Sequence, residues 1–164
     1  MTMTHATDPA ALLHEATAFL WAEADMLDAC AYDAWLDLWM PDGMYIMPIG
    51  EGTDYANQLN LCHDDARMRR DRVGRFQAGF SISSAPPART VRTVGRIVID
   101  AAEGDTIRLR AAEHLIESKF GRQRAWAADL SYELRREAGG LRLHRKVAKL
   151  LNSDGMLNSF SYLF

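Results

Sequence analysis

The sequence predicts an α+β fold in which an antiparallel sheet folds over one long helix. Apolar residues recur at helical spacing before residue 40. After residue 90 they alternate with polar residues, which is the spacing of strands with one buried face. Short glycine-containing turns separate the alternating segments. Helices followed by a run of long strands are typical of an α+β domain rather than of alternating β-α units.

The long helix is predicted over residues 8–30. Asp8 can cap its first turn, and Pro9 suits the first helical position. Its apolar stripe consists of Leu12, Ala16, Phe19, Leu20 and Leu27. We place three acidic residues on its wetter side: Glu15, Glu23 and Asp25. A second, short helix is predicted over residues 32–39, with Trp35, Leu36 and Trp39 turned inward.

The middle of the chain is less regular. Pro41-Asp42-Gly43 predicts a turn, because proline fixes φ and glycine tolerates positive φ. Residues 44–49 predict a short strand, and residues 50–60 predict a loop. A further helix is expected over residues 64–77, where Asp64 or Asp65 near the start favours the helix dipole. Residues 81–88, rich in serine and proline, predict another loop.

The second half predicts long strands. Ile107, Leu109 and Ala111 alternate with Arg108 and Arg110. The same period gives strands over residues 90–100, 106–118, 124–136 and 141–151. The turns between them contain Gly104, Gly121, and Gly139 with Gly140.

Length and composition limit the class of protein. The 164 residues suit one domain, 1–164, whose first eight residues are expected to form a flexible N-terminal tail. With a net charge of −3, the chain has no overall excess of basic residues with which to bind nucleic acid. No apolar run is long enough to span a membrane. No secretion signal is visible at the N-terminus, so we expect a cytoplasmic protein.

Metal centres are not expected in this chain. Cys30 and Cys62 are too far apart to form a paired-ligand motif, and we expect both to be free thiols. His63-Asp64-Asp65 offers ligand atoms, but adjacent residues rarely converge on one metal, so a helix start is the simpler interpretation. Several arginines follow, and we interpret them as a solvated or interfacial helix face: Arg67, Arg69, Arg70, Arg72 and Arg75.

Four segments, in this order, resemble one family. They are Glu23-Ala24-Asp25-Met26-Leu27-Asp28 with Tyr32-Asp33-Ala34-Trp35-Leu36, then His63-Asp64-Asp65 with Arg72-Val73-Gly74-Arg75-Phe76, then Pro87-Ala88-Arg89-Thr90, and last Gly140-Leu141-Arg142-Leu143-His144-Arg145-Lys146. They are similar to the β (small) subunits of bacterial aromatic-ring-hydroxylating dioxygenases. The sequence departs from the family's usual residues at Leu141, Asn152 and Gly95-Arg96, which leaves the substrate open.

The resemblance implies a cystatin-like cone, the fold shared by nuclear transport factor two and scytalone dehydratase. In it, a long N-terminal helix and short helices pack in a strongly curved, mixed, mostly antiparallel sheet. It also implies a non-catalytic, structural subunit without a cofactor of its own. The partners would be a catalytic α subunit, holding a Rieske [2Fe-2S] cluster and a mononuclear iron, and other β subunits in an α3β3 assembly.

A free-standing enzyme of the same cone fold is the alternative. A dehydratase or isomerase acting on a small cyclic substrate needs a desolvated carboxyl group near an imidazole. Asp28 at the end of the first helix and His114 in the middle of a strand are the candidate pair. The other interpretation makes Asp28 a hydrogen-bonding partner near the helix end and His114 an exposed or interface residue.

The C-terminal segment is expected to be tied down. Its last seven residues include Phe160, Tyr162, Leu163 and Phe164. Such side chains are stabilised by burial, so we expect this segment to lie along the sheet or at a subunit contact.

Overall fold

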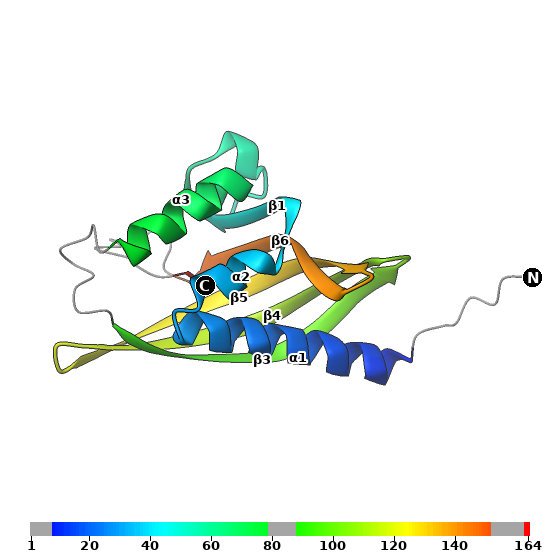
Figure 1. Ribbon diagram of the computed structural model, residues 1–164, viewed down its shortest axis with the longest axis horizontal. Coiled ribbons are helices and arrows are strands. Elements are labelled where there is room, and N and C mark those ends of the chain that lie inside the picture. The colour runs from blue at the N-terminus through cyan, green and yellow to red at the C-terminus, as the bar shows by residue number, and fades with distance from the viewer. Residues whose placement is uncertain (1–7, 79–87, 152–162) are drawn as a thin grey trace, which may run out of the picture.

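The fold is a curled, mixed sheet that wraps one side of a long helix (Figure 1). The structure is a computed structural model and describes residues 8–78, 88–151 and 163–164. Its helices are α1 (Pro9–Asp28), α2 (Tyr32–Asp37) and α3 (Ala66–Gln77), with a short 3-10 helix, η1 (Tyr55–Asn57). The strands are β1 (Trp39–Pro48), β2 (Asn60–Asp64), β3 (Arg89–Glu103), β4 (Thr106–Lys119), β5 (Arg122–Glu137) and β6 (Gly140–Leu150).

The six strands lie in the order β2-β1-β6-β5-β4-β3. All neighbours pair antiparallel except β1 and β6, which are parallel. The four long strands follow one another along the chain as hairpins, whereas β1 joins the sheet beside the last strand. The expected α+β cone with a mixed, mostly antiparallel sheet is therefore confirmed.

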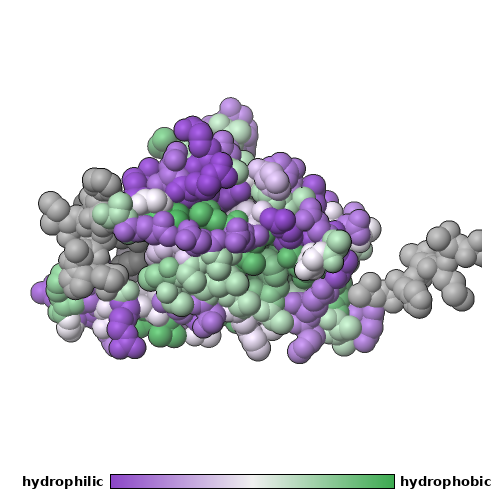
Figure 2. All heavy atoms as spheres, in the orientation of Figure 1, coloured by the Kyte–Doolittle hydropathy of each residue, from purple (hydrophilic) through white to green (hydrophobic). Residues whose placement is uncertain are grey.

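Helix α1 forms where the period predicts it. The Asp8 carboxylate accepts from the Ala10 backbone N–H at 3.1 Å, and Pro9 occupies the first turn. Leu12, Ala16 and Leu20 are buried against the concave side of the sheet. The outward side of α1 carries Ala10, Ala11, Ala18 and Ala22. Figure 2 shows a pale green surface over part of this helix. In the same view, the surface over helix α3 is hydrophilic.

An aromatic cluster fixes the start of the sheet against α2. The rings of Trp35 and Trp39 meet edge to face with centroids 5.5 Å apart, and Trp35 meets Tyr45 in the same way at 5.7 Å. Such pairs add about 0.5–1.5 kcal/mol each beyond the area they bury. These three side chains are almost completely buried.

Two sequence predictions in this region are wrong. Helix α2 ends at Asp37, and Trp39 begins β1 rather than ending the helix. The turn expected at Pro41-Asp42-Gly43 lies within β1, where the pairing with β6 is irregular: Trp39 pairs with Leu143 and Met44 with Arg145. The chain bulges here without reversing direction, because both flanking segments stay paired with β6.

Strand β2 was not expected, and neither was η1. The segment over residues 60–64 is short and mostly polar. It forms a strand because it pairs with β1, not because its residues alternate. Among the described residues, no helix has the length and apolar character needed to cross a bilayer.

Candidate functional site

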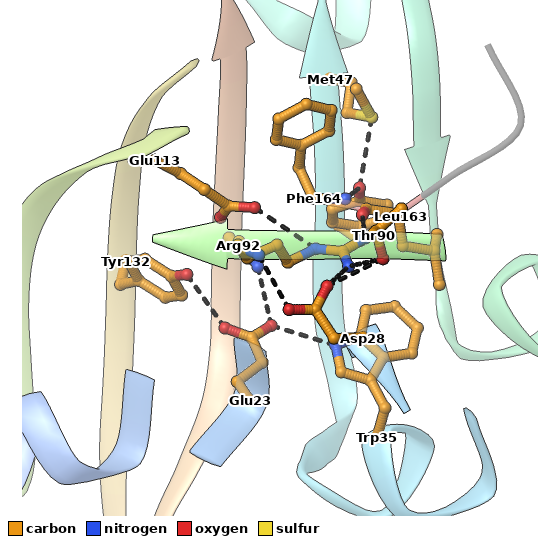
Figure 3. Close-up of polar contacts among 12 residues, drawn as sticks. Glu23, Asp28, Trp35, Met47, Thr90, Arg92, Glu113, Tyr132, Leu163 and Phe164 are labelled. Atoms are coloured by element: carbon orange, nitrogen blue, oxygen red, sulfur yellow. Dashed lines mark hydrogen bonds and ion pairs between the residues drawn. The ribbon is translucent and has the colours of Figure 1, made fainter. Parts of the chain in front are cut away.

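The concave interior holds a set of paired charges (Figure 3). We call Glu23, Asp28, Arg92, Glu113 and Lys146 the interior network. Glu23 comes from α1 and is 1% exposed, as is Lys146 of β6. One Glu23 oxygen accepts from Lys146 Nζ at 2.8 Å and from the Trp35 indole N–H at 3.0 Å. The other accepts from the Tyr132 hydroxyl at 2.9 Å.

The sequence suggested that Glu23 lies on the solvent-exposed side of α1, and this prediction is wrong. It lies on the buried side because three donors from α2, β5 and β6 converge on its carboxylate. A charge can be buried in this way only when it is paired and hydrogen-bonded. Burial and the neighbouring Glu23 charge raise the pKa of Tyr132 well above its ordinary value, so its hydroxyl acts here as a donor.

The second half of the network joins the end of α1 to β3. Asp28 accepts from the Thr90 hydroxyl at 2.8 Å and from the Arg92 backbone N–H at 2.8 Å, and it pairs with the Arg92 guanidinium. Arg92 also donates to the backbone carbonyl of Leu163, near the end of the chain. Arg92 thus connects helix, strand and C-terminal residues in one buried contact (Figure 3).

Glu113 of β4 is the least well paired member. Its nearest cation is the Arg92 Nε, 3.4 Å from Oε1, and neither atom makes a hydrogen bond. Burial raises the pKa of Glu113; Lys146 and Arg92 oppose the shift, and the Glu23 and Asp28 charges add to it. The network contains three carboxyl groups and two cations, which also favours the neutral form of one acid.

The structure does not bring Asp28 and His114 together. His114 is exposed and lies opposite Thr93 and Ala127 in the sheet. Glu113, the residue before it, is buried, and successive strand residues point to opposite faces. His114 therefore faces outward, while the Asp28 carboxylate is bonded to Thr90 and Arg92.

The acidic segment before α3 is only in part the expected helix start, because His63 and Asp64 end β2 and the helix begins after Asp65. Asp65 caps α3 by accepting from the Met68 N–H at 2.9 Å. Asp64 is buried, and its carboxylate takes both a 2.5 Å and a 3.0 Å hydrogen bond from Arg72. This two-point geometry suits arginine and a carboxylate.

Arg69, which the sequence placed on a solvated or interfacial face, is in fact buried. Its guanidinium lies 4.2 Å from the centre of the Trp39 ring and donates to the Gly43 and Asp64 carbonyls. Burial lowers the pKa of Arg69 to about 10. The outcome differs from the prediction because the Gly43 and Met40 carbonyls, in the irregular part of β1, accept hydrogen bonds from the Arg69 guanidinium.

Cys30 and Cys62 are both free, as expected; Cys30 is exposed and Cys62 buried. Burial raises the pKa of the Cys62 thiol to about 12, so it stays neutral. In the described ranges, no three histidine, cysteine or acidic side chains gather as a metal would require. A shallow hollow of about 360 Å³ on the outer side of the sheet is lined by His63, His144 and Arg145, among others.

A sequence model for the family described as "Ring hydroxylating beta subunit" matches residues 22–154. The chain belongs to this family. It is thus the small, β-type subunit of a ring-hydroxylating oxygenase, and the resemblance inferred from its sequence segments is confirmed.

Relatives of the β subunit support the same assignment. The small oxygenase component of the p-cumate 2,3-dioxygenase system of Pseudomonas putida is 31% identical over 130 residues, which cover 77% of this chain and 72% of that one. The small subunit of anthranilate 1,2-dioxygenase from Acinetobacter baylyi is 24% identical over 155 residues, covering 87% and 92%. Among solved structures, the β subunit of benzoate 1,2-dioxygenase from Burkholderia mallei has a TM-score of 0.75 at 22% identity, covering 95% and 97%.

The wider fold class agrees as well. An NTF2-like protein with a cystatin-like fold from Novosphingobium aromaticivorans has a TM-score of 0.61 at 16% identity, covering 94% of this chain and 99% of that one. At this identity the likeness concerns the fold alone.

Sequence reasoning missed most of the interior network of this β subunit. One usable signal was present: Glu113 sits at an inward position of β4, in line with the buried apolar residues Leu109, Ala111 and Leu115. Lys146 has no such signal, because the irregular pairing between Glu133 and Leu134 shifts the register of β6.

Proposed function

We propose that this chain, as one domain over residues 1–164, is the non-catalytic structural subunit of a cytoplasmic Rieske non-haem iron oxygenase that acts on aromatic compounds. The large α subunit would hold the Rieske [2Fe-2S] cluster and the mononuclear iron. Three copies of each subunit would form the α3β3 complex. The family match supports a small-subunit role, and the names of the relatives suggest an aromatic substrate.

The interior network is the observation that carries the non-catalytic part of this proposal. An acid–base catalyst must be able to exchange a proton with a substrate held within hydrogen-bond reach. Here the Glu23 and Asp28 carboxylates are each held by three donor groups of the chain itself. Their role in this arrangement is to fix α1 in the sheet.

The proposal is tested by expressing the large subunit with and without this chain. We expect co-expression to give one complex containing three copies of each subunit by light scattering, with its iron retained in the large subunit when the two are separated. A large subunit that reaches the same mass, iron content and activity without this chain would contradict the structural role.

A further inference from the structure

The first half of the sheet has apolar side chains on both of its faces. Tyr45 and Met47 of β1 belong to the core. Met44 and Ile46 therefore lie on the opposite, outer face, because successive strand residues point to opposite sides of a sheet. Ile46 is nevertheless only 3% exposed. The outer face of β1 is therefore covered by another part of the chain.

Residues 50–59 cross this outer face and are held against β6 at two points. The Arg145 guanidinium lies 5.2 Å from the centre of the Tyr55 ring. Lys149 pairs with Glu51. The loop and the strands thus border the hollow of about 360 Å³ on this side of the sheet, which we call the outer hollow. Its lining includes Met44, Ile46, Tyr55, His63, His144 and Arg145.

The acidic side chains at the outer hollow already have partners in the chain. The Asp54 carboxylate accepts from the Asn57 amide at 3.1 and 3.0 Å. The His144 ring has a carboxylate at each nitrogen, Glu133 at 2.8 Å and Asp42 at 3.4 Å. These groups therefore balance one another within the chain.

Arg145 and His63 are the groups left to meet a ligand. In the part of the chain that the structure describes, neither side chain forms a hydrogen bond or an ion pair, and Arg145 contacts only the Tyr55 ring. A guanidinium held in this way still offers a planar set of N–H donors, which a carboxylate can accept in pairs. The volume of the hollow is also within the range of about 300–1,000 Å³ that is usual for small-molecule sites.

We propose that the outer hollow binds a small carboxylate with an apolar body. The carboxylate group pairs with Arg145 and accepts a hydrogen bond from His63. The apolar part lies against Met44 and the Tyr55 ring. An exposed ion pair alone is weak, so the apolar contact is what selects this ligand over a bare carboxylate. Every group of the site belongs to this chain, so binding does not require the large subunit.

Benzoate is a suitable probe, because it joins a carboxylate to an aromatic ring. It is titrated into the full-length chain, whose methionine methyl groups are labelled for NMR. Met44 lies in the outer hollow, and Met68 on α3, which is 40% exposed, is the control. We expect a saturable shift of the Met44 signal and none for Met68. No shift of Met44 up to about 10 mM benzoate would overturn the proposal.

Two further ligands separate the charge from the ring. Benzamide keeps the ring without the charge, and acetate keeps the charge without the ring. Each should bind more weakly than benzoate by about tenfold or more. Acetate that binds as tightly as benzoate would show that a bare carboxylate is enough, as on an acidic side chain of a partner protein, and would contradict the proposal.

A matched pair of variants locates the site. Arg145→Gln removes the charge from an exposed position and should weaken benzoate binding by about tenfold or more. Arg122→Gln makes the same change at an exposed position of β5 and should bind as the wild type does. An equal effect of the two variants would count against the site. The comparison with benzamide uses the wild-type chain, so it decides the matter even where Arg145→Gln is unstable.

Discussion

Lys146 is the residue whose removal should disturb the interior network most. Its ammonium group pairs with Glu23 where both side chains are 1% exposed. Lys146→Met would leave the Glu23 carboxylate buried without its cation, which costs about 3–5 kcal/mol of unfolding free energy. Adding Glu23→Gln should recover part of this loss, because the amide oxygen can still accept from Trp35 and Tyr132 without a buried charge. Urea unfolding of the two variants checks this, and a further loss on adding Glu23→Gln would contradict it.

Glu113 should make stability depend on pH. Its pKa is raised in the folded chain by burial, so the folded state holds a proton that the unfolded state has already released. The stabilisation from this proton is complete below the ordinary carboxyl pKa of 4.5 and is lost as pH rises through the folded value. We expect Glu113→Gln to flatten the stability profile above pH 4.5 and to be at least as stable as the wild type at neutral pH. A variant that keeps the wild-type slope would disprove this assignment.

At the scale of elements, α1 is fixed to the edge of the sheet by side chains that bond the backbone of β3. Asp28 accepts from the Arg92 N–H, and the Trp21 indole donates to the Val94 carbonyl at 3.1 Å. β3 is an edge strand, so these groups would otherwise be open to pairing with another chain. Helix α1 therefore protects an edge as well as covering the core.

Asp28→Ala should accordingly act on stability. It removes the partners of Thr90 and of the buried Arg92, and we expect a loss of about 3–5 kcal/mol in unfolding free energy. His114→Ala, on the outward face of the sheet, should stay within about 0.5 kcal/mol of the wild type. Thermal and urea unfolding of the isolated chain distinguish the two. Equal stability of the variants would show that Asp28 does not anchor α1.

The sequence predicts elements better than it predicts their contacts. The period of α1 and of the four long strands is local, so these elements could be recognised from neighbouring residues. Strand β2 and the bulge in β1 depend on pairing with distant segments, and the turn residues Pro41 and Gly43 suggested a chain reversal that does not occur. Glu23 and Arg69 were placed in solvent because their donors and acceptors come from other parts of the chain.

At the scale of the whole molecule, the last two residues of the chain belong to the hydrophobic core. Leu163 and Phe164 are buried, and the Phe164 N–H donates to the Tyr45 hydroxyl at 3.0 Å. The expectation that the C-terminal segment is tied down is confirmed for these two residues. Residues 152–162, including Phe160 and Tyr162, lie outside the described residues. A role of this segment in contacts between β subunits stays a prediction.

Deleting Leu163 and Phe164 should therefore destabilise the isolated chain. Each buried side chain contributes about 1.5–3 kcal/mol, and Arg92 would also lose its bond to the Leu163 carbonyl. We expect a lower unfolding temperature and a smaller yield of soluble protein. A truncated chain with wild-type stability would show that these residues do not complete the core.

The central claim is that this chain supports an oxygenase without supplying a catalytic group, and the turnover rate per iron in the assembled complex tests it most directly. The complex should be prepared with the wild-type chain, with His114→Ala and with Glu113→Gln, and its mass confirmed in each case. We predict rates equal to the wild type within about twofold, since neither residue would touch the substrate. General acid–base catalysis typically contributes about a hundredfold or more. A loss of that size in a complex of unchanged mass and iron content would contradict the account.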